Sequence, residues 1–363
     1  MTNGTTPRRA YIGSFTSDGG RGITTAAVDP ATGALMPLHH TDDTVADPSF
    51  LALAPQGGVL YCVSETDQGG AAAFTLGPAA DPALLGDRVA VEGAAPTHLT
   101  VAAGHLYTAN YGSGSVTRLP LRADGGLEAR PLTHQHHGQG PVTDRQEGPH
   151  AHAVVPDPTG RWLLCTDLGT DSVWSYDLRD GAAGLHPHRE VRLRAGTGPR
   201  HLAFAAAPAA GPDGHREPDG VGRVYIINEL DPTLTTCRWH PATGELEPLG
   251  ETGVLPAGAR TAGTYPSALV LSADGRRVWV ANRGDDSIAV LDLTAPELPE
   301  LLTTVPCGGH WPRDLALDPT GRRLYAANER SGDVTWFDVD PDTGTPHRAG
   351  ALAAPAASCV VFD

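Results

Sequence analysis

An internal repeat limits the fold of this chain more than any other feature of its sequence. Each repeat has a proline, two residues and an apolar residue, then a Pro/Asp-x-Gly turn, an apolar run ending in a polar residue, and Gly/Ser-x-Val. The intervals between successive repeats are 48, 53, 50, 67 and 46 residues. The six repeats begin at Pro48, Pro96, Pro149, Pro199, Pro266 and Pro312. A period near 50 residues built from short strands is typical of a β-propeller, in which each blade has four strands.

Polar residues that end the second strand of each repeat predict seven blades. They are Ser14, Ser64, Asn110, Asp167, Asn228, Asn282 and Asn328. Only six repeats have the complete first strand, and the apolar segment Ser358–Phe362 can supply the missing one. The sequence therefore predicts an all-β, seven-bladed β-propeller with four strands per blade, in which the C-terminal strand completes the N-terminal blade beside Tyr11–Phe15.

The repeat covers almost the whole chain, which predicts a single domain over residues 8–363 with residues 1–7 as a disordered tail. The 67-residue interval is explained by an insertion, Pro208–Gly222, which is rich in Ala, Pro, Gly and Asp and is predicted to be a surface loop. Glycine and proline number 44 and 32 of 363 residues, a frequency that suits a turn-dense, all-β protein.

The charge of the chain excludes several classes of partner. The formal net charge is −16, so neither nucleic acid nor an anionic membrane is an expected partner. All 26 basic residues are arginines. The absence of lysine excludes Schiff-base chemistry, and any bound anion must be held by Arg, His or backbone N–H groups.

Three features predict a reduced, cytoplasmic protein. No apolar run is long enough to span a membrane, and the polar start Met1–Arg9 lacks the apolar region of a secretory signal. The five cysteines are scattered and contain no CxxC pair. The sequence also lacks GxSxG, HExxH, a phosphate-binding Gly-rich loop and an EF-hand loop, which disfavours the common serine and zinc hydrolases.

Residues at the start of the inner strands converge on the central channel of a propeller, and here they vary in chemistry. They are Ser49, Thr97, His150, Arg200, Ser267 and Arg313. The residues after the second strands vary as well: Glu65, Tyr111, Leu168, Glu229, Arg283 and Glu329. We interpret Asn110, Asp167, Asn282 and Asn328 as turn-forming residues that the repeats share. Repeat packing does not require Arg200, Glu229 and Arg283, so we interpret these three as functional.

A histidine-rich stretch runs from His134 to His152. His134, His136 and His137 could form a metal-binding tract, but we favour a solvated loop. His150 and His152 are two residues apart, so on a strand they face the same side. They could chelate a metal, but a general base with a hydrogen-bonding neighbour suits the nearby arginines better.

Several of these motifs together resemble the seven-bladed propeller lactonase family, which includes bacterial 6-phosphogluconolactonases and is related to fungal carboxymuconate lactonizing enzymes. The similar segments are Arg145–His152, Asp167–Asp171, Gly198–His201, Asn228–Leu230, Asn282–Gly284 with Ser287–Ile288, and Pro312–Asp314. The resemblance implies a catalytic set of a His, two Arg and a Glu, matched by His150 or His152, Arg200, Glu229 and Arg283. We add as substrate-binding candidates Arg145, Gln146, His201, Asn228, Asn282 and Arg313.

The resemblance predicts a lactonase that hydrolyses a sugar-type lactone, with 6-phosphogluconolactone as the first candidate. In this hypothesis His or Glu229 activates water as general base, while arginines stabilise the oxyanion and hold the anionic group of the substrate. No cofactor, metal or covalent nucleophile is required. The expected partner is a small anionic lactone, and the expected state is a monomer or weak homo-oligomer.

Three other functions remain open at this stage. A lactone-forming cyclase would use the same residues in the reverse direction. A Ca²⁺-dependent sugar lactonase needs oxygen ligands, and Arg200 and Arg283 argue against a cation there. A non-catalytic interaction platform would not need a His/Arg/Glu cluster in the channel. The sequence does not decide between His150 and His152 as the base.

Overall fold

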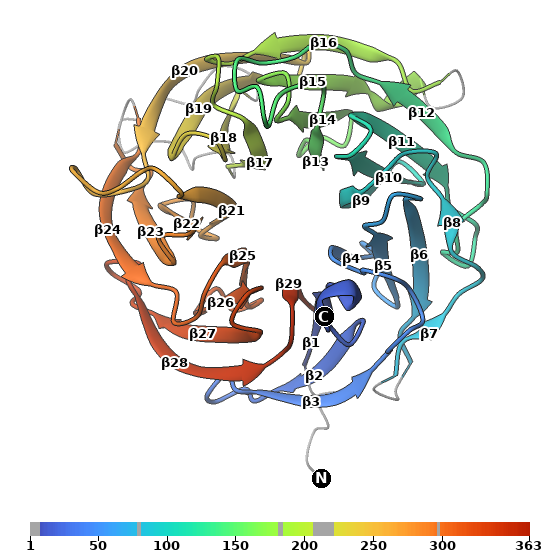
Figure 1. Cartoon of the computed structure of the whole chain (residues 1–363), viewed down its shortest axis with the longest axis horizontal. Coiled ribbons are helices and arrows are strands. Elements are labelled where there is room, and N and C mark those ends of the chain that lie inside the picture. Colours follow the sequence, from blue (N-terminus) through green and yellow to red (C-terminus); the bar gives the residue numbers. More distant parts are fainter. Residues whose placement is uncertain (1–7, 78–80, 181–183, 206–220, 296–297) are drawn as a thin grey trace.

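In the computed structural model, which describes residues 8–77, 81–180, 184–205, 221–295 and 298–363, seven antiparallel sheets form a ring around a central opening (Figure 1). The prediction of an all-β, seven-bladed propeller is confirmed. The helical elements of these residues are two 3-10 turns, η1 (Thr16–Asp18) and η2 (Leu178–Asp180). The predicted tail, 1–7, and most of the predicted loop Pro208–Gly222 lie outside the described residues.

Each blade runs from an inner strand at the channel to an outer strand at the rim. From inside to outside, blade one has β29 (Ala357–Phe362), β1 (Arg9–Ser14), β2 (Thr24–Val28) and β3 (Leu35–His40). Blade two has β4 (Leu51–Leu53), β5 (Val59–Ser64), β6 (Gly70–Thr75) and, at the outside, the pair β7 (Ala83–Leu84) and β8 (Val89–Ala90). Blade three has β9 (Pro96–Ala102), β10 (His105–Asn110), β11 (Ser115–Pro120) and β12 (Leu132–Gln135).

The other four blades follow the same order. Blade four has β13 (Ala151–Pro156), β14 (Trp162–Asp167), β15 (Ser172–Asp177) and β16 (Pro187–Arg192), and blade five has β17 (Pro199–Phe204), β18 (Gly222–Asn228), β19 (Thr233–His240) and β20 (Glu245–Gly253). Blade six has β21 (Tyr265–Leu271), β22 (Arg277–Arg283), β23 (Ser287–Asp292) and β24 (Glu300–Pro306). Blade seven has β25 (Pro312–Leu317), β26 (Arg323–Asn328), β27 (Asp333–Val339) and β28 (Pro346–Ala353).

The two ends of the chain share the first blade, as the sequence predicts. β29 pairs antiparallel with β1, with Tyr11 opposite Val361 and Ile12 opposite Val360. The ladder continues to Asp363, whose Oδ1 accepts a 2.7 Å hydrogen bond from the Arg9 N–H. This pairing joins the first and last blades, so the ring has no open seam.

The second strands are apolar on both faces because each sheet lies between two neighbouring blades. All six residues of β5 and of β14 are buried. Aromatic side chains of second strands also fasten one blade to the next. Trp162 Nε1 donates to Pro241 O (2.7 Å), Trp279 Nε1 to Gly344 O (2.8 Å), and the Tyr325 hydroxyl to Gly33 O (2.8 Å). These bonds satisfy the polar atom of a large buried ring.

A β-bulge near the start of the inner strand is a second feature of the repeat. In six blades the register between inner and second strand shifts at this point. In the blade of β17, for example, Pro199 is opposite Asn228 and His201 is opposite Ile227, which leaves Arg200 as the extra residue. A bulge re-aims side chains, and here it brings one residue per blade to the channel mouth.

Candidate active site

The bulge positions correct the alignment of the fourth blade. There Ala151 is opposite Asp167 and Ala153 is opposite Thr166, so His152, and not His150, occupies the position that Arg200 has in the next blade. The sequence alignment is wrong by two residues because Pro149 imitates the proline of the other repeats. His150 is instead the residue before the inner strand, and its carbonyl accepts from Leu168 N (2.9 Å).

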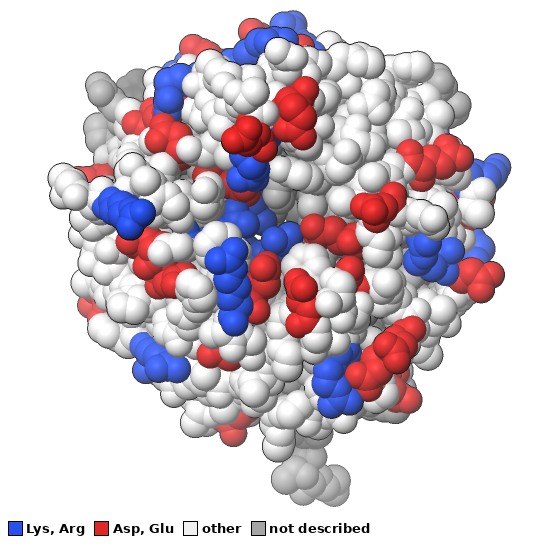
Figure 2. All heavy atoms as spheres, in the orientation of Figure 1, with Lys and Arg blue, Asp and Glu red and all other residues white. Residues whose placement is uncertain are grey.

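In five blades the residue after the second strand is held at the channel mouth by the same backbone bond. Its N–H donates to the carbonyl of the residue before the inner strand, for example from Glu229 to Gly198 (2.8 Å) and from Glu329 to Trp311 (3.1 Å). This bond explains why residues far apart in the sequence converge on one opening. Figure 2 shows basic and acidic side chains meeting around it.

Glu229 lies at the centre of three arginines, which we call the Glu229 cluster. Its Oε2 is 3.0 Å from Arg200 Nε and 2.6 Å from Arg283 Nη2, and its Oε1 contacts Arg145 Nη2. The contacts of Arg200 and Arg283 are ion pairs without hydrogen-bond alignment, since the described residues give these two nitrogens no hydrogen-bond acceptor. The structure brings the predicted residues Arg200, Glu229 and Arg283 together, and Arg145 joins them.

The arginines keep Glu229 ionised. Burial alone would raise the pKa of this carboxyl, but Arg283, Arg200 and Arg145 outweigh it and hold the pKa well below its usual range. A carboxylate held in this way does not take up a proton at neutral pH. Glu229 therefore orients the arginines, and the geometry does not support it as the general base.

Arg313 lies at the centre of two carboxylates, which together we call the Arg313 cluster. Its Nη2 is 3.3 Å from Glu65 Oε1 and its Nη1 is 3.2 Å from Glu329 Oε2. Burial raises the pKa of Glu65 above its usual value, and Arg313 offsets only part of this shift. Sequence analysis placed Glu65 and Glu329 at the channel but did not include them among the site residues. The signal was their position after the second strand, the same as that of Glu229.

His150 is held with one ring nitrogen ready to accept a proton. Its Nδ1 is 2.9 Å from the carbonyl oxygen of Tyr111, and because a carbonyl can only accept, Nδ1 carries the hydrogen. The lone pair is then on Nε2, which is 3.3 Å from Glu147 Oε1. The imidazole also stacks on the Tyr111 ring, with centroids 4.4 Å apart. The Tyr111 hydroxyl accepts from Arg145 Nη2 (3.3 Å), which links His150 to the Glu229 cluster.

His152 has a different environment. It is buried, and its Nδ1 has no hydrogen-bond partner among the described residues. Burial, and then the charges of Arg200, Arg313 and Arg283, lower its pKa well below the usual value. His201 lies one position after Arg200, with its ring centroid 5.3 Å from those of His152 and His98, and its pKa is lowered for similar reasons. These rings lie beneath the arginines and resist protonation.

Three predicted substrate-binding residues have buried side chains that bond within the fold. Gln146 Nε2 donates to Leu168 O (2.8 Å), and its Oε1 accepts from Val142 N (3.0 Å). Asn228 Nδ2 donates to Thr233 and Thr235, and Asn282 Nδ2 donates to Val254 O and Ser287. All three are 0% exposed. The structure therefore does not bring Gln146, Asn228 or Asn282 to the site.

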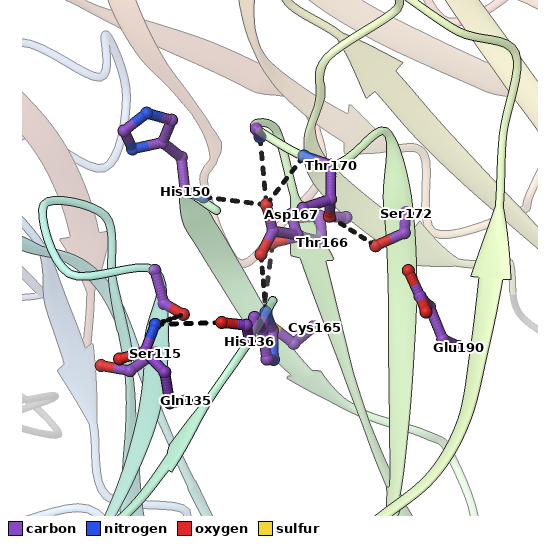
Figure 3. Close-up of polar contacts among 12 residues, drawn as sticks. Ser115, Gln135, His136, His150, Cys165, Thr166, Asp167, Thr170, Ser172 and Glu190 are labelled. Carbon is purple, nitrogen blue, oxygen red and sulfur yellow. Dashed lines mark hydrogen bonds and ion pairs between the residues drawn. The ribbon is translucent and has the colours of Figure 1, made fainter. Parts of the chain in front are cut away.

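The prediction of a solvated loop is wrong for His136. Its side chain is 0% exposed, and its Nδ1 is 2.6 Å from Oδ2 of the equally buried Asp167 (Figure 3). His134 is half-buried and His137 is exposed. Asp167 also accepts from the backbone N–H of His150 (2.8 Å), so this part of the loop belongs to the surroundings of the site.

Aromatic rings of the mouth were missed by the sequence analysis. The Trp311 ring contacts two arginines: its centroid is 3.4 Å from Arg330 Cζ and 5.5 Å from Arg283 Cζ. The Tyr265 ring is 6.1 Å from Trp311, and its carbonyl accepts from Arg283 Nε (3.0 Å). Both precede a repeat proline, and that position was the only available signal.

The described residues contain no group of three or more His, Cys, Asp or Glu side chains arranged to hold a metal ion. A metal-free reaction stays a prediction. No helix in the same ranges has the length and apolar character needed to cross a membrane.

Known proteins share both the sequence pattern and the fold. Residues 9–362 match the family model described as "Lactonase, 7-bladed beta-propeller". The chain belongs to this family. It is 30% identical to the 6-phosphogluconolactonase of Bacillus subtilis over 361 residues, which cover 97% of each chain.

Two solved structures resemble the chain over nearly its whole length. One is a periplasmic gluconolactonase of Pseudomonas aeruginosa, with a TM-score of 0.85, 28% identity and 98% coverage of each chain. The other is a protein from Lactobacillus plantarum, with a TM-score of 0.85, 29% identity, and coverage of 98% of this chain and 99% of that one. The expected family is therefore confirmed.

Proposed function

We propose that the protein hydrolyses a sugar-type lactone with an anionic substituent, and that 6-phosphogluconolactone is the first substrate to test. Membership of the lactonase family and the name of the Bacillus subtilis relative support this proposal. The observation that carries it is the combination at one mouth of three arginines on Glu229 with a histidine, His150, whose Nε2 carries no hydrogen.

In this proposal His150 is the general base. Its Nε2 takes a proton from water as the water oxygen attacks the lactone carbonyl, and the resulting imidazolium is stabilised by Glu147, 3.3 Å away. Collapse of the tetrahedral intermediate breaks the ring C–O bond, and the imidazolium returns the proton to the leaving alkoxide. The lowered pKa of His152 makes that residue a weaker base and leaves it the role of a neutral neighbour.

The Glu229 cluster supplies the positive charge that the reaction needs. Three guanidinium groups share one carboxylate, so the cluster has a formal charge of +2. Arg200 and Arg283 are buried, so their charge is little screened and suits the developing oxyanion. Arg145 has the most exposed side chain of the three, at 35%, which suits it to the anionic substituent of the substrate.

The Arg313 cluster suits the hydroxyl groups of the sugar. It pairs one guanidinium with two carboxylates, which gives a formal charge of −1. Carboxylates accept hydrogen bonds from hydroxyls. We therefore assign Glu65 and Glu329 to the uncharged side of the substrate, opposite the Glu229 cluster.

An unphosphorylated sugar lactone is the second candidate substrate. The Pseudomonas aeruginosa relative is named a gluconolactonase, and the carboxylates of the Arg313 cluster offset part of the positive charge at the mouth. The catalytic assignments are the same for both substrates, so the two candidates differ only in what Arg145 contacts.

A lactone panel tests the proposal directly. The purified protein is assayed with 6-phosphogluconolactone, gluconolactone and δ-valerolactone, with and without EDTA, and with unsaturated dicarboxylic acids for the cyclisation direction. We expect the fastest hydrolysis with the phosphorylated lactone and no effect of EDTA. Absence of hydrolysis with every lactone would refute the proposal, and cyclisation alone would replace it with the cyclase function.

A further inference from the structure

Blade four departs from the other blades at the end of its second strand. Four blades have asparagine at this position, and in three of them the amide donates to a threonine seven residues later: Asn110 to Thr117 (2.9 Å), Asn228 to Thr235 (2.8 Å) and Asn328 to Thr335 (3.1 Å). In blade four the pair is replaced by Asp167 and Trp174. A carboxylate cannot donate, and Trp174 leaves no hydroxyl at this place, so the buried acid needs other partners.

Donors from three segments surround the Asp167 carboxylate (Figure 3). Its Oδ1 accepts from the backbone N–H of His150 (2.8 Å), Gly169 (3.0 Å) and Thr170 (3.1 Å). Its Oδ2 is 2.6 Å from His136 Nδ1. The acid is 0% exposed, and these four donors replace the water that an ionised carboxylate would otherwise bind.

His136 is itself fixed at its other ring nitrogen. Its Nε2 is 2.7 Å from the Tyr176 hydroxyl, and its ring stacks on Trp174 with centroids 4.5 Å apart. His136 follows β12 of the third blade, whereas Asp167 and Tyr176 belong to the fourth. The buried series Tyr176–His136–Asp167 therefore connects two blades and ends at the backbone of His150.

The same turn also contacts the His150 ring. A Cβ on Gly169 would lie 2.9 Å from His150 Cδ2 and 1.9 Å from Gly148 O, so the glycine allows the turn to pack directly against the imidazole. In four blades the residue before the inner strand has a positive φ, from 46° to 65°; these are Ala95, Gly198, Trp311 and Ala356. His150 does not, and it is the residue whose N–H the acid of its own blade holds.

We propose that Asp167, held by His136 and Tyr176, is the positioning residue for His150. This inference rests on the proposed function, in which His150 is the base. The bond to the His150 N–H fixes the backbone, and the ring then lies over Tyr111 with Nδ1 on its carbonyl. The buried negative charge also favours the protonated imidazole that forms during the reaction.

Other charged or titratable groups face the same ring. Glu147 lies at Nε2, Tyr111 stacks on the ring, Arg145 bonds to the Tyr111 hydroxyl, and the His152 ring packs against Tyr111. The negative charge of Glu147 opposes loss of a proton from the His150 imidazolium, and the positive charge of Arg145 favours it. Substitution of Asp167 leaves all four groups in place, so a change in the pH profile can be assigned to the acid.

Asp167→Asn is the decisive variant, because asparagine is the residue that four other blades have at this position. Its Oδ1 can still accept the three backbone N–H groups, but the negative charge is lost. We expect kcat/KM to fall at least about 10-fold with KM within about twofold, and the acid limb of the kcat/KM–pH profile to move to lower pH. Tyr176→Phe should move the limb in the same direction by a smaller amount.

Ser172→Ala is the matched control. Ser172 is buried at the start of β15, directly after this turn, and its hydroxyl bonds to Thr170 (2.7 Å) and not to the side chain of Asp167, His136 or His150. We expect its pH profile to be that of the unmodified protein. A profile unchanged in folded Asp167→Asn, or in Tyr176→Phe if Asp167→Asn does not fold, would overturn the inference.

Hydrogen exchange separates this inference from the proposed function. In Asp167→Asn, the backbone N–H groups of His150, Gly169 and Thr170 bond to a neutral amide oxygen, which is a weaker acceptor than a carboxylate. They should therefore exchange faster than in the unmodified protein, whether or not any lactone is hydrolysed. If the unmodified protein hydrolyses no lactone, the proposed function fails while exchange still reports whether Asp167 holds His150. Unchanged exchange at all three positions would contradict the positioning role in either case.

Discussion

The two charged clusters of the channel mouth have opposite designs. The Glu229 cluster places one carboxylate among three arginines, and the Arg313 cluster places one arginine between two carboxylates. Both use the same two positions of the repeat, the inner-strand bulge and the residue after the second strand. The comparison shows that a repeated scaffold can give two parts of one channel mouth different charge, and that Tyr111 links the Glu229 cluster to His150, whose Nε2 carries no hydrogen.

The largest effect is expected from the histidine linked to the Glu229 cluster. His150→Gln should lower kcat by about 10²–10⁴-fold with little change in KM, because a general base acts in the transition state. His152→Gln should have a much smaller effect on kcat, since the pKa of His152 is already too low for an efficient base at pH 7. Steady-state kinetics with the best lactone of the panel measure both, and the reverse order of effects would move the base to His152.

The second prediction compares one carboxylate from each cluster. Glu229→Gln leaves three arginines without their shared carboxylate, which should lower the free energy of unfolding by about 3 kcal/mol or more. Glu329→Gln removes one of two carboxylates from Arg313 and should lower it by about 1 kcal/mol. Urea denaturation measures both values. Equal losses would show that the Glu229 cluster is no more strongly coupled than the Arg313 cluster.

His98, a histidine close to Arg200, gives a smaller, pH-dependent effect on the free energy of unfolding. Burial, and then Arg200, lower the pKa of His98 to about 3. In the unfolded chain histidine binds a proton below about pH 6.5, so unfolding takes up protons and the free energy of unfolding falls as the pH drops from 6.5 toward 3.

His98→Asn should remove part of this dependence. One fully buried histidine changes the free energy of unfolding by about 1.4 kcal/mol per pH unit in this range. His98 contributes less because it is only half-buried. Urea denaturation at pH 7, 6 and 5 measures the slope, with the exposed His347→Asn as the matched control. An unchanged slope for His98→Asn would mean that His98 is protonated in the folded protein.

The fold could be predicted from the sequence because the repeat consists of residues with clear local structural preferences. Each proline, turn and polar strand end marks the same place in a blade, and the missing first strand points to Ser358–Phe362. Arg200, Glu229 and Arg283 could be found because they depart from what repeat packing requires. Glu65 and Glu329 occupy the same position of the repeat as Glu229 but were not included among the predicted site residues.

The remaining site residues depend on features that a single sequence does not show. A bulge changes the register by one residue, and Pro149 hides the two-residue displacement of His152 in blade four. Polar residues such as Gln146 and Asn282 look equally suited to binding a ligand or to bonding inside the fold. His136 follows an exposed strand end, and only the partner Asp167, 31 residues away, explains its burial.

In the proposed function, the Glu229 cluster binds the anionic group of the substrate and the Arg313 cluster binds its hydroxyl groups. Substrate specificity tests this assignment most directly. The quantity is the ratio of kcat/KM for 6-phosphogluconolactone to kcat/KM for gluconolactone, measured for Arg145→Met and Glu65→Gln. Arg145→Met should lower the ratio about 10- to 100-fold, because it removes a charge-assisted hydrogen bond to the phosphate. Glu65→Gln should lower kcat/KM for both substrates and leave the ratio within about twofold of its original value. An unchanged ratio in Arg145→Met, together with a lowered ratio in Glu65→Gln, would contradict the account.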